Sequence, residues 1–131
     1  MLPATATVFE TAKTMRESNI GDVIVVEDGS QSLCGIVTDR DLVVRVIAEG
    51  RDPRTTRLKN VCSRQLLALT PTQTTDEAAK LMRGRAVRRL PVVDTSQERA
   101  VVVGIVSLGD LAESLDRKSV LGQISAMAPN H

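Results

Sequence analysis

Two short segments of the chain carry a hydroxyl side chain followed, three residues later, by a carboxylate. The pairs are Thr38 with Asp41, in GIVTDRDL at 35–42, and Ser107 with Asp110, in GIVSLGDL at 104–111. The apolar residues ahead of each hydroxyl are typical of a strand, so each pair is expected where a strand passes into a helix. Free amides at a helix N-terminus can hold a phosphate, and an ionised carboxylate, which only accepts hydrogen bonds, suits the two hydroxyls of a ribose.

The same residues also have a purely structural interpretation. The two hydroxyl residues would be helix N-caps and the two aspartates would be favoured by the helix dipole, each cap stabilising its helix by about 1 kcal/mol. Two further features of the sequence favour ligand binding instead. Gly35 and Gly104 allow another group to approach the backbone closely, and a hydroxyl beside free amides is a natural phosphate site. Both interpretations stay open at this point.

Both segments belong to an internal duplication. AKTMR at 12–16 matches AKLMR at 79–83, and VIVVE at 23–27 matches LPVVD at 90–94, each at a shift of 67 residues (79 minus 12). The glycine-led segments match at a shift of 69 (104 minus 35). The second unit therefore has two extra residues between Val93 and Gly104, where 95–98 has the composition of a polar turn. Two homologous units therefore make up almost the whole chain.

Each unit is predicted to be a helix, two strands and a second helix. TVFE at 7–10 and TTDE at 74–77 contain capping boxes that open amphipathic helices. Apolar runs separated by polar turns then predict a two-stranded hairpin. The expected helix faces are Val8, Ala12 and Met15; Ala78, Ala79, Leu81 and Met82; and, from Asp39 to Gly50, Leu42, Val43, Val46 and Ile47. The fold class is α/β of the α+β type: two pseudo-symmetric repeats, each a small sheet covered by two helices.

The boundaries follow from the duplication. The first repeat with its linker spans 1–57, the second spans 58–117, and a tail occupies 118–131. A short helix at 58–61 and a strand at 65–69 lead into the second repeat, whereas the lead-in strand of the first is short or truncated. In the tail, Val120, Ile124 and Met127 keep helical spacing. It would bind a partner chain or cap the core, and the cap is preferred.

Composition excludes several classes of function. The chain has 131 residues, a net charge of +1 and one aromatic residue, Phe9, so it lacks the stacking platforms of nucleic-acid binders. Its longest apolar run, 100–106, cannot cross a bilayer, and no signal peptide opens the chain. Cys34 and Cys62 lack the spacing of a zinc or redox pair, so a reducing cytoplasm is expected. The one histidine, His131, is terminal.

An enzyme would have to work with carboxylates, lysines or cysteines alone. The candidates are Asp39, Asp41, Lys13 and Lys80, and nothing in their spacing aims them at a common atom. Hydrolysis of a phosphate at the two neighbouring aspartates is the least implausible version. We therefore expect no catalytic residues and no metal site.

With RRLPVVD at 88–94, the duplicated unit and the two GIV[TS]xxDL segments, residues from about 5 to 115 resemble a tandem pair of CBS domains, the Bateman module. The resemblance implies that AMP, ADP, ATP or S-adenosylmethionine binds in the cleft between the repeats, and that the chain forms a homodimer. It implies that the two aspartates hold ribose hydroxyls, that Thr38 and Ser107 lie near phosphate, and that backbone with apolar side chains encloses adenine.

Arg88 and Arg89 stand just ahead of the Leu90 strand, where related modules place basic residues that reach phosphate. Alternation along a strand should send one toward the cleft and the other to solvent. Lys80, Arg83 and Arg85 are interpreted as a solvated face. The first repeat has Gly21 and Asp22 in place of the two arginines, and Asp22 would repel a polyphosphate. Two unequal sites are therefore expected, with one competent site, and the second repeat is favoured.

Two functions follow from these observations. The first is a regulatory module that senses an adenine nucleotide and acts on a protein partner through dimer packing, with no membrane and no nucleic acid involved. The alternative is a structural dimerisation scaffold in which the same residues only cap helices and nothing binds.

Overall fold

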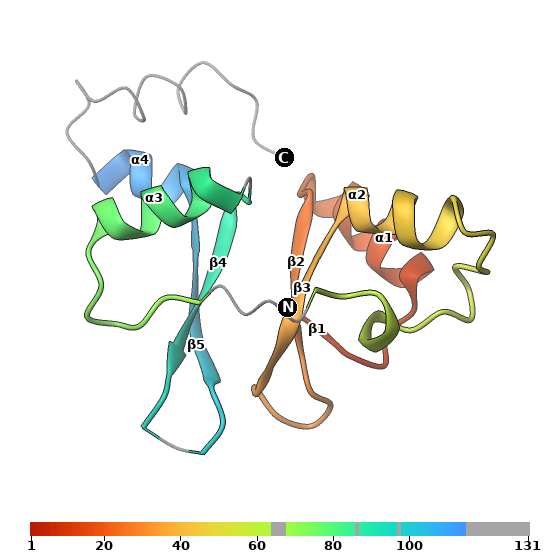
Figure 1. Cartoon of the computed structure of the whole chain (residues 1–131), viewed down its shortest axis with the longest axis horizontal. Coiled ribbons are helices and arrows are strands. Elements are labelled where there is room, and N and C mark those ends of the chain that lie inside the picture. The colour runs from red at the N-terminus through yellow and green to blue at the C-terminus, as the bar shows by residue number, and fades with distance from the viewer. Residues whose placement is uncertain (64–67, 86, 97, 115–131) are drawn as a thin grey trace.

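The computed structural model describes residues 1–63, 68–85, 87–96 and 98–114 (Figure 1). The first repeat contains β1 (Leu2–Pro3), α1 (Val8–Ser18), β2 (Asp22–Val26), β3 (Leu33–Thr38) and α2 (Asp39–Leu42), which continues as a π-helical turn (Val43–Ile47). A 3-10 turn (Leu58–Asn60) follows. The second repeat contains α3 (Thr75–Arg85), β4 (Arg89–Asp94), β5 (Val101–Ser107) and α4 (Leu108–Ser114). The predicted α+β class and the duplicated order of elements are confirmed.

The two sheets share their pairing pattern. β2 pairs antiparallel with β3 and β4 with β5, and a register irregularity falls between Val25 and Val26 in one and between Val92 and Val93 in the other. The lead-in strands also correspond, because Leu2 pairs parallel with Val25, as Leu69 does with Val92. The first repeat therefore has a lead-in strand, and it is short, at two residues.

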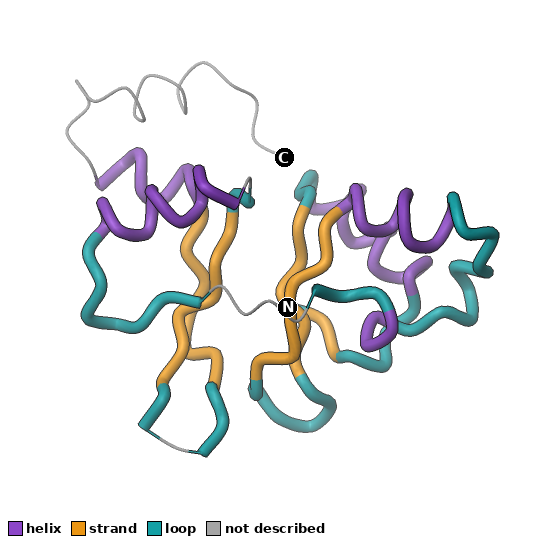
Figure 2. The backbone as a smooth tube through the Cα atoms, in the orientation of Figure 1, coloured by secondary structure: helices purple, strands orange, loops and turns teal. Residues whose placement is uncertain are grey.

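The sheets lie next to each other in the centre of the molecule, with helices on the outer sides (Figure 2). The beginnings of β3 and β5 join them: the Leu33 N–H donates to the Ala100 carbonyl at 2.9 Å, and the Val102 N–H donates to the Gln31 carbonyl at 2.8 Å. An exposed ion pair between Arg99 and Glu27 at 2.6 Å lies in the same region of the chain. The two repeats are thus connected directly through their strands.

Every residue of β2 is buried, because both faces of this strand are covered. Val23 and Val25 pack with α1 and α2, while Ile24 and Val26 pack in the cluster that contains the second repeat's residues. Alternation along a strand sends neighbouring side chains to opposite faces. The continuous apolar run at 23–26 is therefore the signature of a strand that lies between a helical layer and the other repeat.

Four helix positions differ from the predicted faces. In α1, Val8 and Met15 are buried as expected, but the third buried residue is Thr11, and Ala12 is exposed. The Thr11 hydroxyl donates to the Thr7 carbonyl at 2.9 Å, which satisfies its polar group inside the helix. After α2, Leu42 and Val46 are buried, whereas Val43 and Ile47 are 58% and 60% exposed. The π-helical winding there departs from the 3.6-residue period on which that prediction rested.

Residues just after the linker pack with the first repeat. Leu58, Val61 and Cys62 are buried in the same cluster as Val23, Val25 and Val46. By sequence they stand at the start of the second unit. The chain therefore completes the first repeat's core before it enters the second.

Candidate functional site

The first hydroxyl–carboxylate pair forms a complete capping box at the start of α2. The Thr38 hydroxyl accepts from the Asp41 N–H at 3.1 Å, and one oxygen of the Asp41 carboxylate accepts from the Thr38 N–H at 2.8 Å. Thr38 has extended backbone angles, as an N-cap residue requires. These two residues therefore form a helix cap, as the structural interpretation predicted. The cap uses only one of the two carboxylate oxygens of Asp41.

The second pair repeats this geometry at the start of α4. The Ser107 hydroxyl accepts from the Asp110 N–H at 3.1 Å, and the Asp110 carboxylate accepts from the Ser107 N–H at 3.0 Å. The turns that lead into the helices also match, since the N–H groups of Asp39 and Leu108 each donate at 2.8 Å to carbonyls at equivalent positions. Substitution of serine for threonine leaves the local structure unchanged.

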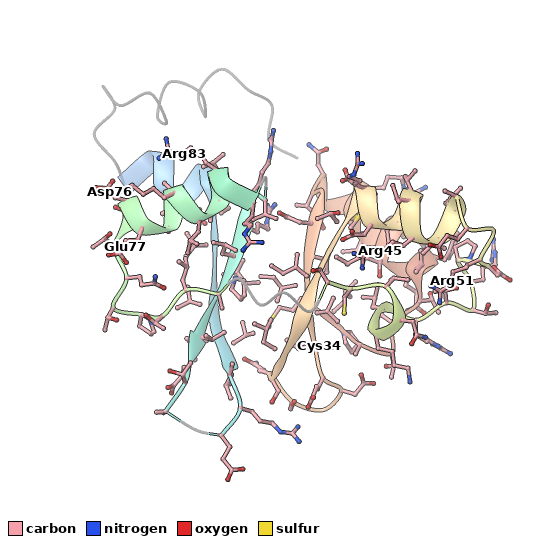
Figure 3. The ribbon with its side chains drawn as sticks, viewed as in Figure 1. Cys34, Arg45, Arg51, Asp76, Glu77 and Arg83 are labelled. Carbon is pink, nitrogen blue, oxygen red and sulfur yellow. The ribbon has the colours of Figure 1, made fainter. Side chains whose placement is uncertain are left out.

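The two boxes lie at corresponding ends of the two sheets, because β3 and β5 both run from their hairpins toward the helices (Figure 1). The second oxygen of Asp41 lies 3.8 Å from Nε of Arg45, whose guanidinium also donates to the Val61 carbonyl at 3.2 Å. Figure 3 shows Arg45 on the helical segment after β3. The Asp110 residue is exposed, and no described residue bonds its second oxygen. Each site thus retains an acceptor for a further hydroxyl, and the one on Asp110 is the more accessible.

Gly35 and Gly104 have different surroundings. A Cβ at Gly35 would lie 2.3 Å from the Ser63 carbonyl oxygen and 3.2 Å from Sγ of Cys62. At Gly104 the nearest atom, Cβ of Val92, would be 3.9 Å away. The close backbone approach expected at both glycines is made at Gly35 by the chain itself. The proposed contact of either glycine with a ligand stays a prediction.

Asp22 joins the two repeats, a role that the sequence did not suggest. One oxygen of its carboxylate accepts from the N–H groups of Arg88 and Arg89 at 3.0 and 3.1 Å, and the other lies 3.4 Å from the Arg89 guanidinium. The Asp22 residue is 5% exposed. Asp22 and Arg89 are equivalent positions of the duplication (89 minus 22 is 67), so each repeat supplies one member of the pair.

Arg88 and Arg89, at the start of β4, are consequently not a free basic pair. Arg89 faces Asp22, and Arg88, which is half-buried, anchors the same carboxylate through its backbone. Lys80, Arg83 and Arg85 are exposed on α3, where Figure 3 labels Arg83. Opposite charges at matched positions of a duplicated unit are the sequence signal that could have revealed the contact between Asp22 and Arg89.

Within the described ranges, no group of three or more histidine, cysteine, aspartate or glutamate side chains could hold a metal ion. Cys34 and Cys62 are both free thiols. No described helix is long and apolar enough to cross a membrane.

Comparison with known proteins gives a consistent result. The family model for the CBS domain matches residues 1–48 and 58–117. YhcV of Bacillus subtilis, a CBS domain-containing protein, is 42% identical over 106 residues, which cover 81% of this chain and 71% of YhcV. A CBS-domain protein from Burkholderia ambifaria has a similar structure, with a TM-score of 0.73, 32% identity, and coverage of 91% of this chain and 83% of that one. Hypoxic Response Protein I, solved with two coordinated zinc ions, gives a TM-score of 0.71 at 31% identity, covering 87% of this chain and 89% of its own.

Proposed function

Since the chain belongs to the CBS domain family, we propose that it is a regulatory module that binds an adenosine-type nucleotide between its two repeats. CBS domain proteins are regulatory modules, and many bind adenosine ligands. The candidate ligands are AMP, ADP, ATP and S-adenosylmethionine. The observation that carries the proposal is the pair of matching capping boxes at corresponding ends of the two sheets, each with a carboxylate oxygen that the cap does not use.

The chemistry of that oxygen supports a ribose contact. A carboxylate accepts several hydrogen bonds, so Asp41 and Asp110 can each keep the cap and still accept from a ribose hydroxyl. Thr38 and Ser107 stand one helical turn away, beside the N-terminal amides, where a phosphate would be favoured by the helix dipole. The cap therefore holds the carboxylate in position for the ligand.

The two proposed sites are unequal. Asp41 faces Arg45 and its side chain is 20% exposed, whereas Asp110 is open to solvent. Asp22 and Arg89 pair with each other, so their charges do not distinguish the two sites. We therefore propose one competent site, associated with Ser107 and the more accessible Asp110.

Calorimetric titration with the four candidate ligands tests the proposal. A ligand present at about a hundred times its dissociation constant should stabilise the fold by about 2.7 kcal/mol, which raises the melting temperature by several degrees. Asp110→Asn keeps an oxygen for the cap but loses the charge, so affinity should fall by about tenfold or more. Asp41→Asn should have the smaller effect.

Thr7→Ala is the matched control for these substitutions. Thr7 and Glu10 form a capping box at the start of α1 with the same reciprocal bonds, and this box is not part of the proposed site. Its loss should cost about 1 kcal/mol of stability and leave affinity unchanged. If none of the four ligands binds and Asp110→Asn merely lowers stability as Thr7→Ala does, the alternative of a ligand-free scaffold is correct.

An exposed apolar surface supports the proposed homodimer. Val43, Val44 and Ile47 lie on the helical segment after β3 and are 58%, 46% and 60% exposed. Large side chains of this kind gathered on one segment mark an interaction surface. We propose that a second copy of the chain covers them and that ligand binding acts on a protein partner through the packing of this dimer. A cytoplasmic location and the lack of catalysis remain predictions.

The dimer proposal predicts what happens when two charged side chains are placed on this apolar surface. Val44→Asp together with Ile47→Asp should convert a dimer into a monomer, because two carboxylates would be buried without partners. Light scattering after gel filtration measures the mass, and circular dichroism checks the fold. Ser30→Asp, in the exposed turn between β2 and β3, should leave the mass unchanged. A variant that stays dimeric would place the interface elsewhere.

A further inference from the structure

The start of β4 presents three hydrogen-bond donors to a single carboxylate. The backbone N–H groups of Arg88 and Arg89 are successive along the chain, and both donate to Oδ2 of Asp22, at 3.0 and 3.1 Å. The Arg89 guanidinium lies 3.4 Å from Oδ1 of the same carboxylate. Successive N–H groups that converge on one point form a concavity that binds anions, and a guanidinium matches the oxygens of a carboxylate or a phosphate. The start of β4 is therefore an anion-binding site, and Asp22 fills it from the other repeat.

This anion-binding site lies between the two capping boxes. Asp22 is the Cα partner of Thr38 in the pair of β2 and β3, and Arg89 is the Cα partner of Ser107 in the pair of β4 and β5. Side chains at such opposed positions share one face of a sheet. Because β2 and β4 also contact each other, the four positions form one row across both sheets (Figure 1). A phosphate near Ser107 would therefore lie next to the donors that hold Asp22.

The Asp22 carboxylate is held firmly, but its site can be reached from the Arg89 side. The Asp22 side chain is 6% exposed, whereas the Arg89 side chain is 29% exposed. Withdrawal of the carboxylate without a replacement would leave two N–H groups and a guanidinium desolvated and unpaired. Each N–H group donates to one acceptor at a time, so a second anion can use both of them only by replacing Asp22.

We propose that the start of β4 is a phosphate-binding site that Asp22 occupies, and that Asp22 thereby determines which adenosine ligands bind between the repeats. The second part of this proposal rests on the proposed function. A ligand that carries phosphate on its ribose has to compete with the Asp22 carboxylate, whereas a ligand without phosphate does not. Of the four candidate ligands, S-adenosylmethionine is the one without phosphate, and its sulfonium stands at the 5′ carbon in place of the phosphate.

The melting temperature in inorganic phosphate tests the anion-binding site without any nucleoside. Asp22→Ala vacates the three donors, so about 20 mM sodium phosphate should raise its melting temperature by at least about 3 °C more than sodium chloride of equal ionic strength. The parent should gain only the small stabilisation that phosphate gives folded proteins in general. Glu27→Ala is the matched control and should respond like the parent, because it removes the same charge from the exposed ion pair with Arg99.

Asp22→Asn is the second variant, for the case that the alanine protein is too unstable to measure. Its amide keeps an oxygen for the two N–H groups and releases the guanidinium. Phosphate should therefore stabilise Asp22→Asn more than the parent and less than Asp22→Ala. Equal responses to phosphate in the parent, in Glu27→Ala and in the Asp22 variants would overturn the proposed site.

The affinities for adenosine and AMP, which differ only by a phosphate, test the selectivity. Calorimetry should show that AMP binds the parent no more tightly than adenosine does. Asp22→Ala should increase the affinity for AMP relative to adenosine by about tenfold. An unchanged ratio would overturn the role of Asp22 in selecting the ligand. If phosphate stabilises Asp22→Ala but neither compound binds the parent or the variant, the anion-binding site is correct and the proposed function is wrong.

Discussion

Replacing Asp22 by alanine should lower the free energy of unfolding by about 3–5 kcal/mol, the largest effect that we expect from a single side chain. The substitution leaves the N–H groups of Arg88 and Arg89 without their acceptor and removes the partner of a partly buried guanidinium. Breaking a buried pair from one side costs several kcal/mol because the remaining groups stay desolvated. Since a domain is stable by only about 5–15 kcal/mol, this is a large fraction.

Urea denaturation followed by circular dichroism measures this loss, and three variants separate its causes. Asp22→Asn keeps an oxygen for the two N–H groups and should cost less than alanine. Arg89→Ala should also cost less, because the Asp22 carboxylate keeps both backbone donors. Glu27→Ala breaks the exposed ion pair with Arg99 and should change stability by at most about 1 kcal/mol. An Asp22→Ala protein as stable as the Glu27→Ala protein would refute a joining role for Asp22.

The second large effect is expected at Gly35. Alanine there would place a methyl group 2.3 Å from the Ser63 carbonyl oxygen, which is far inside van der Waals contact with backbone that cannot rotate away. Either β3 or the segment after Val61 has to move, and the bonds between Ile36 and Ser63 would be strained or lost. Overpacking of this kind costs about 1–3 kcal/mol, and more where backbone is the obstacle.

Gly104→Ala is the matched control, because the duplication places this glycine at the same position of β5. Its added methyl group would approach nothing closer than 3.9 Å, so stability should change by less than about 0.5 kcal/mol. Thermal denaturation of the two variants side by side gives the comparison. Equal melting temperatures would show that the contact between Gly35 and Ser63 is not present in solution.

The repeated units could be predicted because their signals are local. Capping boxes, apolar runs and glycine-led turns recur at nearly constant spacing, and each acts within a few residues. The geometry of the two hydroxyl–carboxylate pairs followed for the same reason, since Thr38 and Asp41 bond each other across a single helical turn. These parts of the candidate site depend only on residues that are close together in the sequence.

What the sequence did not reveal depends on how the repeats meet. Asp22 was interpreted as a group that repels a ligand, and Arg89 as one that attracts it, yet the two lie against each other. Leu58 and Val61 were assigned by position to the second unit but pack in the core of the first. Neither contact produces a periodic pattern in the sequence, because residues that meet across an interface have no fixed separation along the chain.

The irregularity in strand register falls at the same place in both hairpins, after Val25 and after Val92. A shared defect of this kind is simplest to explain as inheritance from one half-length ancestor that already contained it. Such an ancestor, pairing with an identical copy, would have presented the same residue twice at the place now held by Asp22 and Arg89, and two like charges there would repel. Opposite charges at this place therefore require two repeats that differ in sequence, which a pair of identical half-length chains could not provide.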